Sequence, residues 1–211
     1  MGSLKGKKFV ASYSGGKDSA LAVYRAINEG LLPLSLMTAY NTDTGGSWFH
    51  GVPESLLKKV ERSLGIPLTF IKTSGGQYTA NFEEALAEAV RRGAEVCVFG
   101  DIDIEEHLEW CSARCENAGI IPYFPLWGGD RKELVREFID AGFSAVITVV
   151  NTELMREGFR GEILTHEIAL AIEKSGTDIC GENGEYHTFV FDGPIFKEKV
   201  DFSILHALYI V

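Results

Sequence analysis

Apolar and polar positions alternate regularly through about the first 150 residues. Short apolar runs, rich in β-branched residues, are followed by longer segments in which apolar residues recur every three or four positions. The short runs predict buried strands, and the longer segments predict amphipathic helices. Repeated alternation of this kind is typical of a parallel sheet with right-handed connections and helices on both faces. The pattern therefore predicts an α/β fold with a doubly wound parallel sheet.

The predicted elements change character after about residue 128. The expected strands before that point cover residues 9–13, 34–40, 67–71 and 95–99, and the proline-containing run 120–127 allows only a short or edge strand. A strand over 144–150, a helix over Glu162–Glu173 and an alternating strand over 189–192 follow. We expect a larger α/β domain over residues 1–128 and a smaller α+β lobe over 129–211.

A glycine-rich turn, Ser14-Gly15-Gly16-Lys17-Asp18-Ser19, separates the first strand from the first helix. Unpaired amides at a helix start carry partial positive charge, so this turn predicts a site for an oligophosphate. Lys17 adds a point charge, and Asp18 is interpreted as a magnesium ligand or a helix cap. The spacing excludes the kinase and GTPase loop and the dinucleotide fingerprint. A plain connecting turn has no use for Lys-Asp at a helix start.

Two other predicted strands end at the same edge of the sheet as this turn. Tyr40 ends the second strand and is a candidate adenine contact, with the polar loop after it as a candidate lid. Gly100 and Asp101 follow the strand over 95–99; the glycine would permit close approach of a nucleotide, and the carboxylate could hold magnesium or a ribose hydroxyl. Asp103 is expected to cap the next helix. His50 is interpreted as a surface residue.

A second polar cluster covers Cys180 to Thr188 and stands between the last helix and the last strand. Glu182, Glu185 and His187 could position an amine, take its proton or bind a metal. The alternative is a hairpin whose acidic side chains are simply solvated. The residues alone leave both interpretations open.

Composition narrows the class of protein. Of 211 residues, 45% are hydrophobic and 24% charged, and the net charge of −10 argues against non-specific binding of nucleic acid or anionic membranes. The apolar run over 145–150 is too short for a membrane span, and no apolar signal segment is seen at the N-terminus, so we expect a cytoplasmic protein. Its four cysteines should be reduced, with Cys111 and Cys115 in the core rather than at a metal.

The turn over 14–19 resembles the Ser-Gly-Gly-x-Asp-Ser loop (PP-loop) of the ATP pyrophosphatases, which cleave ATP between its α and β phosphates. With the cluster over 181–188, the chain resembles the diphthine–ammonia ligase family of these enzymes. Further matching motifs are Gly100-Asp101-Ile102, Pro125-Leu126-Trp127-Gly128 and Asp192-Gly193-Pro194-Ile195-Phe196. The resemblance implies an adenine nucleotide α-hydrolase-like (HUP type) domain, a smaller C-terminal lobe, and an acceptor bound between them.

The resemblance also implies the activity. Such a ligase adenylates the carboxylate of diphthine on elongation factor 2, releases pyrophosphate and transfers ammonia, using ATP and Mg²⁺. The ammonia should arrive free or from a partner protein, and a homo-oligomer stays open. The implied catalytic residues are Lys17, Asp18, Glu182, Glu185 and His187; the nucleotide-binding residues are Ser14, Gly15, Gly16, Lys17, Asp18, Ser19, Tyr40, Gly100 and Asp101; the acceptor-binding residues are Asn183, Glu185 and His187; and the magnesium ligands are Asp18 and Asp101.

The chain departs from the family pattern at two positions. The diphthine branch carries Glu-Gly-Gly-Glu-Phe/Tyr-Glu-Thr where this chain has Glu182-Asn183-Gly184-Glu185-Tyr186-His187-Thr188. Asn183 and His187 instead match a sister branch linked to cobalamin salvage, so amidation of a corrinoid is an alternative. A non-catalytic ATP-binding sensor is a second alternative, and transfer-RNA modification is disfavoured by the acidic charge.

Overall fold

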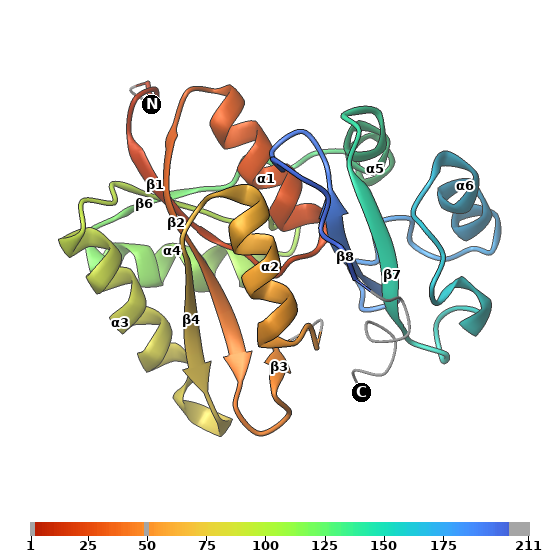
Figure 1. Ribbon diagram of the computed structural model, residues 1–211, viewed down its shortest axis with the longest axis horizontal. Coiled ribbons are helices and arrows are strands. Elements are labelled where there is room, and N and C mark those ends of the chain that lie inside the picture. The colour runs from red at the N-terminus through yellow and green to blue at the C-terminus, as the bar shows by residue number, and fades with distance from the viewer. Residues whose placement is uncertain (1–2, 49–50, 203–211) are drawn as a thin grey trace.

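The computed structural model describes residues 3–48 and 51–202 (Figure 1). Its larger sheet has six strands, and all of its pairings are parallel except that of β3 (Gly46–Ser47), which pairs antiparallel with the end of β2. Across the sheet, the parallel strands are β6 (Ile121–Tyr123), β5 (Val96–Val98), β1 (Lys8–Ser12), β2 (Leu32–Asn41) and β4 (Leu68–Thr73). The predicted mainly parallel α/β sheet is confirmed, and β6 is the short edge strand expected from its prolines.

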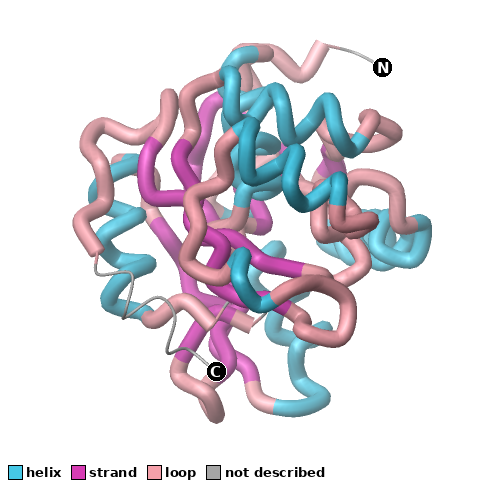
Figure 2. Tube along the Cα trace, turned by 90° about the vertical axis from the view of Figure 1, so that its right-hand side faces the viewer, coloured by secondary structure: helices cyan, strands magenta, loops and turns pink. Residues whose placement is uncertain are grey.

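Successive side chains of the central strands point into two separate hydrophobic clusters. Phe9 of β1 belongs to one cluster, whereas its neighbour Val10 belongs to the other. The first cluster also receives residues of α1 (Lys17–Asn28), α2 (Glu54–Leu64) and α5 (Arg131–Asp140), and the second receives residues of α3 (Tyr78–Arg91) and α4 (Glu105–Ala118). Because side chains alternate along a strand, the two clusters lie on opposite faces of the sheet. Figure 2 shows helices on both sides of the strands. The sheet is therefore doubly wound.

The C-terminal part of the chain forms a second sheet of two antiparallel strands, β7 (Ser144–Val150) and β8 (Tyr186–Asp192). In the sequence, a 3₁₀ turn (Glu157–Phe159) and α6 (His166–Lys174) separate these strands, and both lie at the right of Figure 1. Val146 of β7 and Phe189 of β8 are fully buried and join the same cluster as α1 and α2. One continuous core therefore fixes this small sheet beside the start of α1.

Two local predictions are wrong. The last helix begins at His166 rather than Glu162, because the Thr165 side chain accepts a hydrogen bond from the Ile168 amide and so caps the helix there. Ile163 instead forms a bridge with Val146. Asp103 does not cap α4: the residue at the N-cap is Ile104, and the Asp103 carboxylate pairs with Arg131. A guanidinium offers two charged donors, which compete well against a backbone amide.

Further sequence-based expectations concern the cysteines, a membrane span and two segments outside the described residues. Cys111 and Cys115 are buried free thiols in the cluster of the α3–α4 face, as predicted. Within residues 3–48 and 51–202, no helix combines the length and apolar character that crossing a membrane requires. His50 and the C-terminal stretch 203–211 lie outside the described residues.

Candidate active site

A cavity of about 420 Å³ lies where the carboxyl ends of β1 and β5 meet the C-terminal lobe. Its wall combines residues from the glycine-rich turn, from the end of β5, from α3 and α4, and from the segment before β8. These are Ser12, Ser14, Lys17, Asp18, Ser19, Tyr78, Phe82, Phe99, Gly100, Asp101, His107, Trp110, Cys111, Gly181, Glu182, Gly184, Tyr186, His187 and Thr188. The two polar clusters identified in the sequence thus share one cavity.

Short-range contacts shape the glycine-rich turn. Gly15 has a φ of +87°, which is readily adopted only by glycine, and Gly16 is the N-cap of α1. The Ser14 hydroxyl accepts a hydrogen bond from the Gly16 amide (3.2 Å) and lies 3.2 Å from the Ser19 hydroxyl. Gly16 provides no side-chain cap for the helix. The first turn of α1 contributes Lys17, Asp18 and Ser19 to the cavity wall, and the positive end of a helix at such a wall favours an anion.

Gly100 permits the end of β5 to pass directly beside the start of α1. A Cβ atom at this position would lie 2.9 Å from the backbone of both Asp18 and Ser19, so any other residue would collide there. The close passage brings Asp101 towards Asp18. Burial raises the pKa of Asp101, and the charge of Asp18 acts in the same direction, whereas His107, whose ring nitrogen lies 3.1 Å from the Asp101 carboxylate, opposes it. Two neighbouring carboxylates of this kind favour a cation between them.

Lys17 links the turn to the C-terminal lobe. Its ammonium donates to Asp18 (2.8 Å) and to the carbonyl of Cys180, and it lies 5.3 Å from the centre of the Tyr186 ring. Its backbone amide donates to the Thr188 hydroxyl (3.0 Å). Burial opposes the charge of Lys17, but the surrounding acidic groups, led by Asp18, raise its pKa above the usual range. A buried, permanently charged cation therefore stands at the start of α1.

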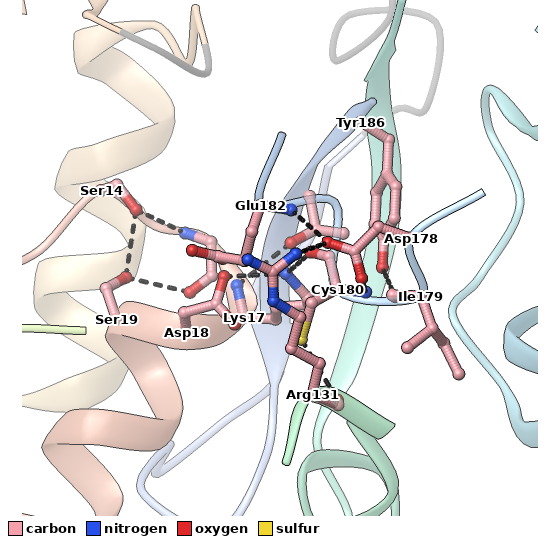
Figure 3. Close-up of polar contacts among 12 residues, drawn as sticks. Ser14, Lys17, Asp18, Ser19, Arg131, Asp178, Ile179, Cys180, Glu182 and Tyr186 are labelled. Carbon is pink, nitrogen blue, oxygen red and sulfur yellow. Dashed lines mark hydrogen bonds and ion pairs between the residues drawn. The ribbon is translucent and has the colours of Figure 1, made fainter. Parts of the chain in front are cut away.

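Side-chain hydrogen bonds hold the segment 178–186 in place (Figure 3). The Asp178 carboxylate accepts hydrogen bonds from the amides of Cys180 (3.1 Å) and Glu182 (3.0 Å), and it pairs with Arg131 (2.6 Å). The Tyr186 hydroxyl donates to the carbonyl of Ile179. These contacts direct Glu182 towards the glycine-rich turn, as Figure 3 shows.

Glu182 and His187 supply titratable groups to the cavity. Burial, followed by the charge of Asp18, raises the pKa of Glu182 to about 7, whereas Lys17 and Arg131 act in the opposite direction. Burial and Lys17 lower the pKa of His187, so its imidazole is neutral at pH 7. A carboxyl group that titrates near neutrality is suited to exchanging protons with a bound substrate.

Some of the predicted site residues do not line the cavity. The Glu185 side chain is 6% exposed, and its carboxylate accepts hydrogen bonds from the amide and the side chain of Asn183, both at 3.0 Å. The Tyr40 ring packs edge-on against Phe70, at 5.6 Å between ring centres. Gly15 and Gly16 contribute backbone rather than lining atoms. The remaining predicted residues lie in the wall: Ser14, Lys17, Asp18, Ser19, Gly100, Asp101, Glu182 and His187.

An aromatic wall, formed by Tyr78, Phe82, Phe99 and Trp110, is the part of the cavity that sequence reasoning missed. Tyr78 and Trp110 stack at 5.5 Å with an interplanar angle of 14°, and burial raises the pKa of Tyr78 to about 12. These aromatic residues fit ordinary apolar stripes of helices and strands, so the pattern gave no sign of a cavity. The signal available was positional, because α3 and α4 begin at the same sheet edge as the glycine-rich turn.

The described part of the chain contains no group of three or more His, Cys, Asp or Glu side chains arranged to hold a metal ion. Asp18 and Asp101 are a pair, both in the cavity wall. Mg²⁺ commonly takes one or two carboxylates and completes its shell with substrate phosphates and water. The residues present therefore fit a magnesium ion that arrives with a phosphorylated ligand.

Two family models match the chain. The model of the diphthamide synthase N-terminal domain matches residues 7–122, and that of the C-terminal domain matches residues 130–208. A diphthine–ammonia ligase of Danio rerio is 24% identical over 227 residues, covering 92% of this chain and 85% of that protein. The human diphthine–ammonia ligase is 34% identical over 90 residues, which cover 41% of this chain and 34% of that protein.

Comparison with solved structures finds a predicted subunit of a tRNA methyltransferase from Methanocaldococcus jannaschii. The sequence identity is 15%, and the TM-score is 0.46. The match covers 92% of this chain and 100% of the other.

Proposed function

The chain belongs to the diphthamide synthase family, and we propose that it is an ATP-dependent ligase that converts a carboxylate of its acceptor into an amide with ammonia. One observation supports this proposal above others. A single cavity holds both an anion site at the start of α1 and a carboxyl group that titrates near pH 7. Activation of a carboxylate needs the first, and deprotonation of an attacking amine needs the second.

The phosphates of ATP bind at the turn over 14–19. The first turn of α1, the Ser14 and Ser19 hydroxyls and the Lys17 ammonium supply the donors and the positive charge. Mg²⁺ would be held by Asp18 and Asp101, and it would offset the repulsion between these carboxylates and the phosphates. The aromatic wall receives the adenine ring, because it is the apolar part of the same cavity. Tyr40 stays the competing adenine contact predicted from the sequence.

The chemistry has two balanced steps. In the first, a carboxylate oxygen of the acceptor attacks the α phosphorus, the bond to the β phosphate breaks, and pyrophosphate leaves. In the second, the lone pair of ammonia attacks the acyl carbon, AMP leaves with the bonding electrons, and the nitrogen loses a proton to Glu182. His187, neutral at pH 7, hydrogen-bonds the acceptor beside it. In this scheme residues 1–128 bind ATP and residues 129–211 bind the acceptor.

The two departures from the diphthine pattern differ in their structural roles. Asn183 binds the buried carboxylate of Glu185, because its backbone amide and its side-chain amide both donate hydrogen bonds to it. His187 lies in the cavity wall. We therefore assign acceptor selection to His187 rather than to Asn183. This placement keeps amidation of a corrinoid carboxylate as a second candidate function.

The test measures release of pyrophosphate and AMP from ATP with magnesium and ammonium. One arm supplies elongation factor 2 carrying diphthine, and the other supplies corrinoid carboxylates. We expect the first acceptor to stimulate release, and stimulation by corrinoids alone would establish the second candidate. Formation of ADP and phosphate would overturn adenylation, and ATP that is bound without turnover in either arm would indicate a sensor.

The variant His187→Glu restores the diphthine-branch residue, and Asn183→Gly is its matched control. If His187 selects the acceptor, His187→Glu changes the ratio of the two acceptor rates by about tenfold, whereas Asn183→Gly leaves the ratio within about twofold. Equal changes in both variants would contradict this assignment.

A further inference from the structure

Arg131 connects the two halves of the cavity wall without lining the cavity itself. It is the first residue of α5, where Asp130 caps the helix through the amides of Lys132 and Glu133. Its guanidinium forms two hydrogen bonds with Asp103, both of 2.7 Å, and a third with Asp178, of 2.6 Å. Asp103 follows β5, and Asp178 precedes the segment that carries Glu182. One guanidinium thus ties the large sheet's ligand edge to the C-terminal lobe.

Asp178 passes this connection on to the active site. The oxygen that pairs with Arg131 also accepts the Glu182 amide, at 3.0 Å, and the other carboxylate oxygen accepts the Cys180 amide, at 3.1 Å. The Cys180 thiol in turn donates to the backbone carbonyl of Arg131, at 3.2 Å. The Cys180 carbonyl accepts from the Lys17 ammonium. A continuous chain of contacts therefore runs from Arg131 to both Glu182 and Lys17, as Figure 3 shows.

We propose that Arg131 is a positioning residue, which acts through Asp178 to hold the segment 178–182 so that Glu182 and the Cys180 carbonyl face Lys17. The proposal deepens the proposed function and rests on it for its catalytic consequence. Arg131 touches no predicted substrate position; besides the direct effect of its charge on the pKa of Glu182, its influence passes through the segment. A guanidinium suits this task because its donors lie in a rigid plane and can serve two carboxylates at once.

The two carboxylate partners of Arg131 differ in a way that supports this assignment. The Asp178 side chain is 12% exposed and holds the segment through three contacts. The Asp103 side chain is 38% exposed, and among residues 3–48 and 51–202 its carboxylate bonds to Arg131 alone. Exposed ion pairs contribute little, whereas shielded, charge-assisted hydrogen bonds contribute more. Substitution of Asp103 is therefore a natural control, because it removes a carboxylate partner from the same guanidinium.

The first test compares Asp178→Asn with Asp103→Asn in the full chain, by hydrogen exchange of the Cys180 and Glu182 amides. We expect faster exchange across 178–182 in Asp178→Asn and wild-type exchange there in Asp103→Asn. Equal exchange in the two variants would overturn the proposal. Because this readout needs no substrate, it holds whether or not the proposed function is correct.

The second test measures amide formation in the same variants. Asp178→Asn should lower kcat by about tenfold, with KM for ATP within about twofold, because the phosphate site is left intact. Asp103→Asn should stay within about twofold of wild type in both constants. A fall in kcat of equal size in both variants would contradict positioning through Asp178.

Variants of Arg131 complete the series. Arg131→Ala should show the same kcat loss as Asp178→Asn, and Arg131→Lys, which keeps the charge and one donor to Asp178, should recover part of the rate. Absence of any recovery, with unchanged exchange of the Glu182 amide, would overturn the proposal. If wild-type protein releases no pyrophosphate with either acceptor, the proposed function fails, while the hydrogen-exchange comparison still decides the structural role.

Discussion

The segments 14–19 and 178–188 meet in one cavity but are held in different ways. The first is built from neighbouring residues: a glycine at positive φ, two serine hydroxyls and the start of one helix. The second is held by its own side chains, such as Asp178 and Tyr186, and also by partners far away in the chain, Arg131 and Lys17. A local turn can place backbone donors for a recurring ligand such as a phosphate. The segment 178–188 also draws on Arg131, outside the turn, so it can be altered with less effect on the turn, which suits it to choosing the acceptor.

The largest effect should come from Lys17, which belongs to both segments through its contacts. Lys17→Met removes the buried cation at the start of α1 and leaves Asp18 and the Cys180 carbonyl without their donor. Loss of one preorganised charge at such a position typically lowers kcat by about 10² to 10³. Pyrophosphate release measures this loss. Lys132→Met removes a lysine that pairs with Glu173 on the surface, and it should leave the rate unchanged.

The second prediction separates the two glutamates of the segment 178–188. A base must be unprotonated, and the pKa of Glu182 is raised to about 7, so the amide-forming rate should rise from about pH 6 to about pH 8. Glu182→Gln should abolish this rise and lower the rate about 10²-fold. Rate profiles against pH, measured with saturating ATP and a constant concentration of unprotonated ammonia, give the comparison.

Glu185→Gln is the control for this pH dependence, because Glu185 is bound to Asn183 rather than placed in the cavity wall. It should retain the rise between about pH 6 and pH 8, since Glu182 is untouched. If Glu185→Gln removed the rise and Glu182→Gln kept it, the proton acceptor would be Glu185.

The difference between the segments also explains what the sequence could predict. The strands, the turn over 14–19 and the buried Cys111 and Cys115 follow from local periodicity and turn chemistry, and the structure confirms their positions. Gly100 was identified from its place at a strand end, although its immediate neighbour is the backbone of α1. Such features depend on residues close in sequence or on a general rule of parallel sheets.

Features that depend on distant partners could not be predicted in the same way. Asp103 is of a residue type that often caps helices and stands just before one. Only the fold brings Arg131 close enough to pair with its carboxylate. Arg131 itself lies on a helix whose charged residues look solvated in sequence. Trp110 stands beside Cys111, and periodicity reports a buried face without distinguishing core from cavity. The roles of the individual site residues stay predictions until variants are measured.

The aromatic wall provides a test of the adenine site, and the expected effect is smaller than for Lys17 and Glu182. Trp110→Ala should weaken ATP binding by about tenfold, because loss of an apolar surface against the base costs about 1–2 kcal/mol. Trp127→Ala is the matched control: Trp127 packs on Phe124 at 6.2 Å and does not line the cavity. The dissociation constant of ATP, measured at equilibrium, is compared among the variants. A tenfold loss in Tyr40→Ala, with none in Trp110→Ala, would place the adenine at the end of β2.

The smallest expected effect concerns the hydrogen bond from the Lys17 amide to the Thr188 hydroxyl, which joins the two segments. Thr188→Val keeps the shape of this buried side chain but removes the acceptor of the Lys17 amide. An unsatisfied buried amide costs about 1–3 kcal/mol, which corresponds to a fall in Tm of several degrees for a chain of this size. Thr188→Ser retains the hydroxyl and should recover most of the stability. If Thr188→Val kept the wild-type Tm while its rate of pyrophosphate release fell, the hydrogen bond would contribute more to catalysis than to stability.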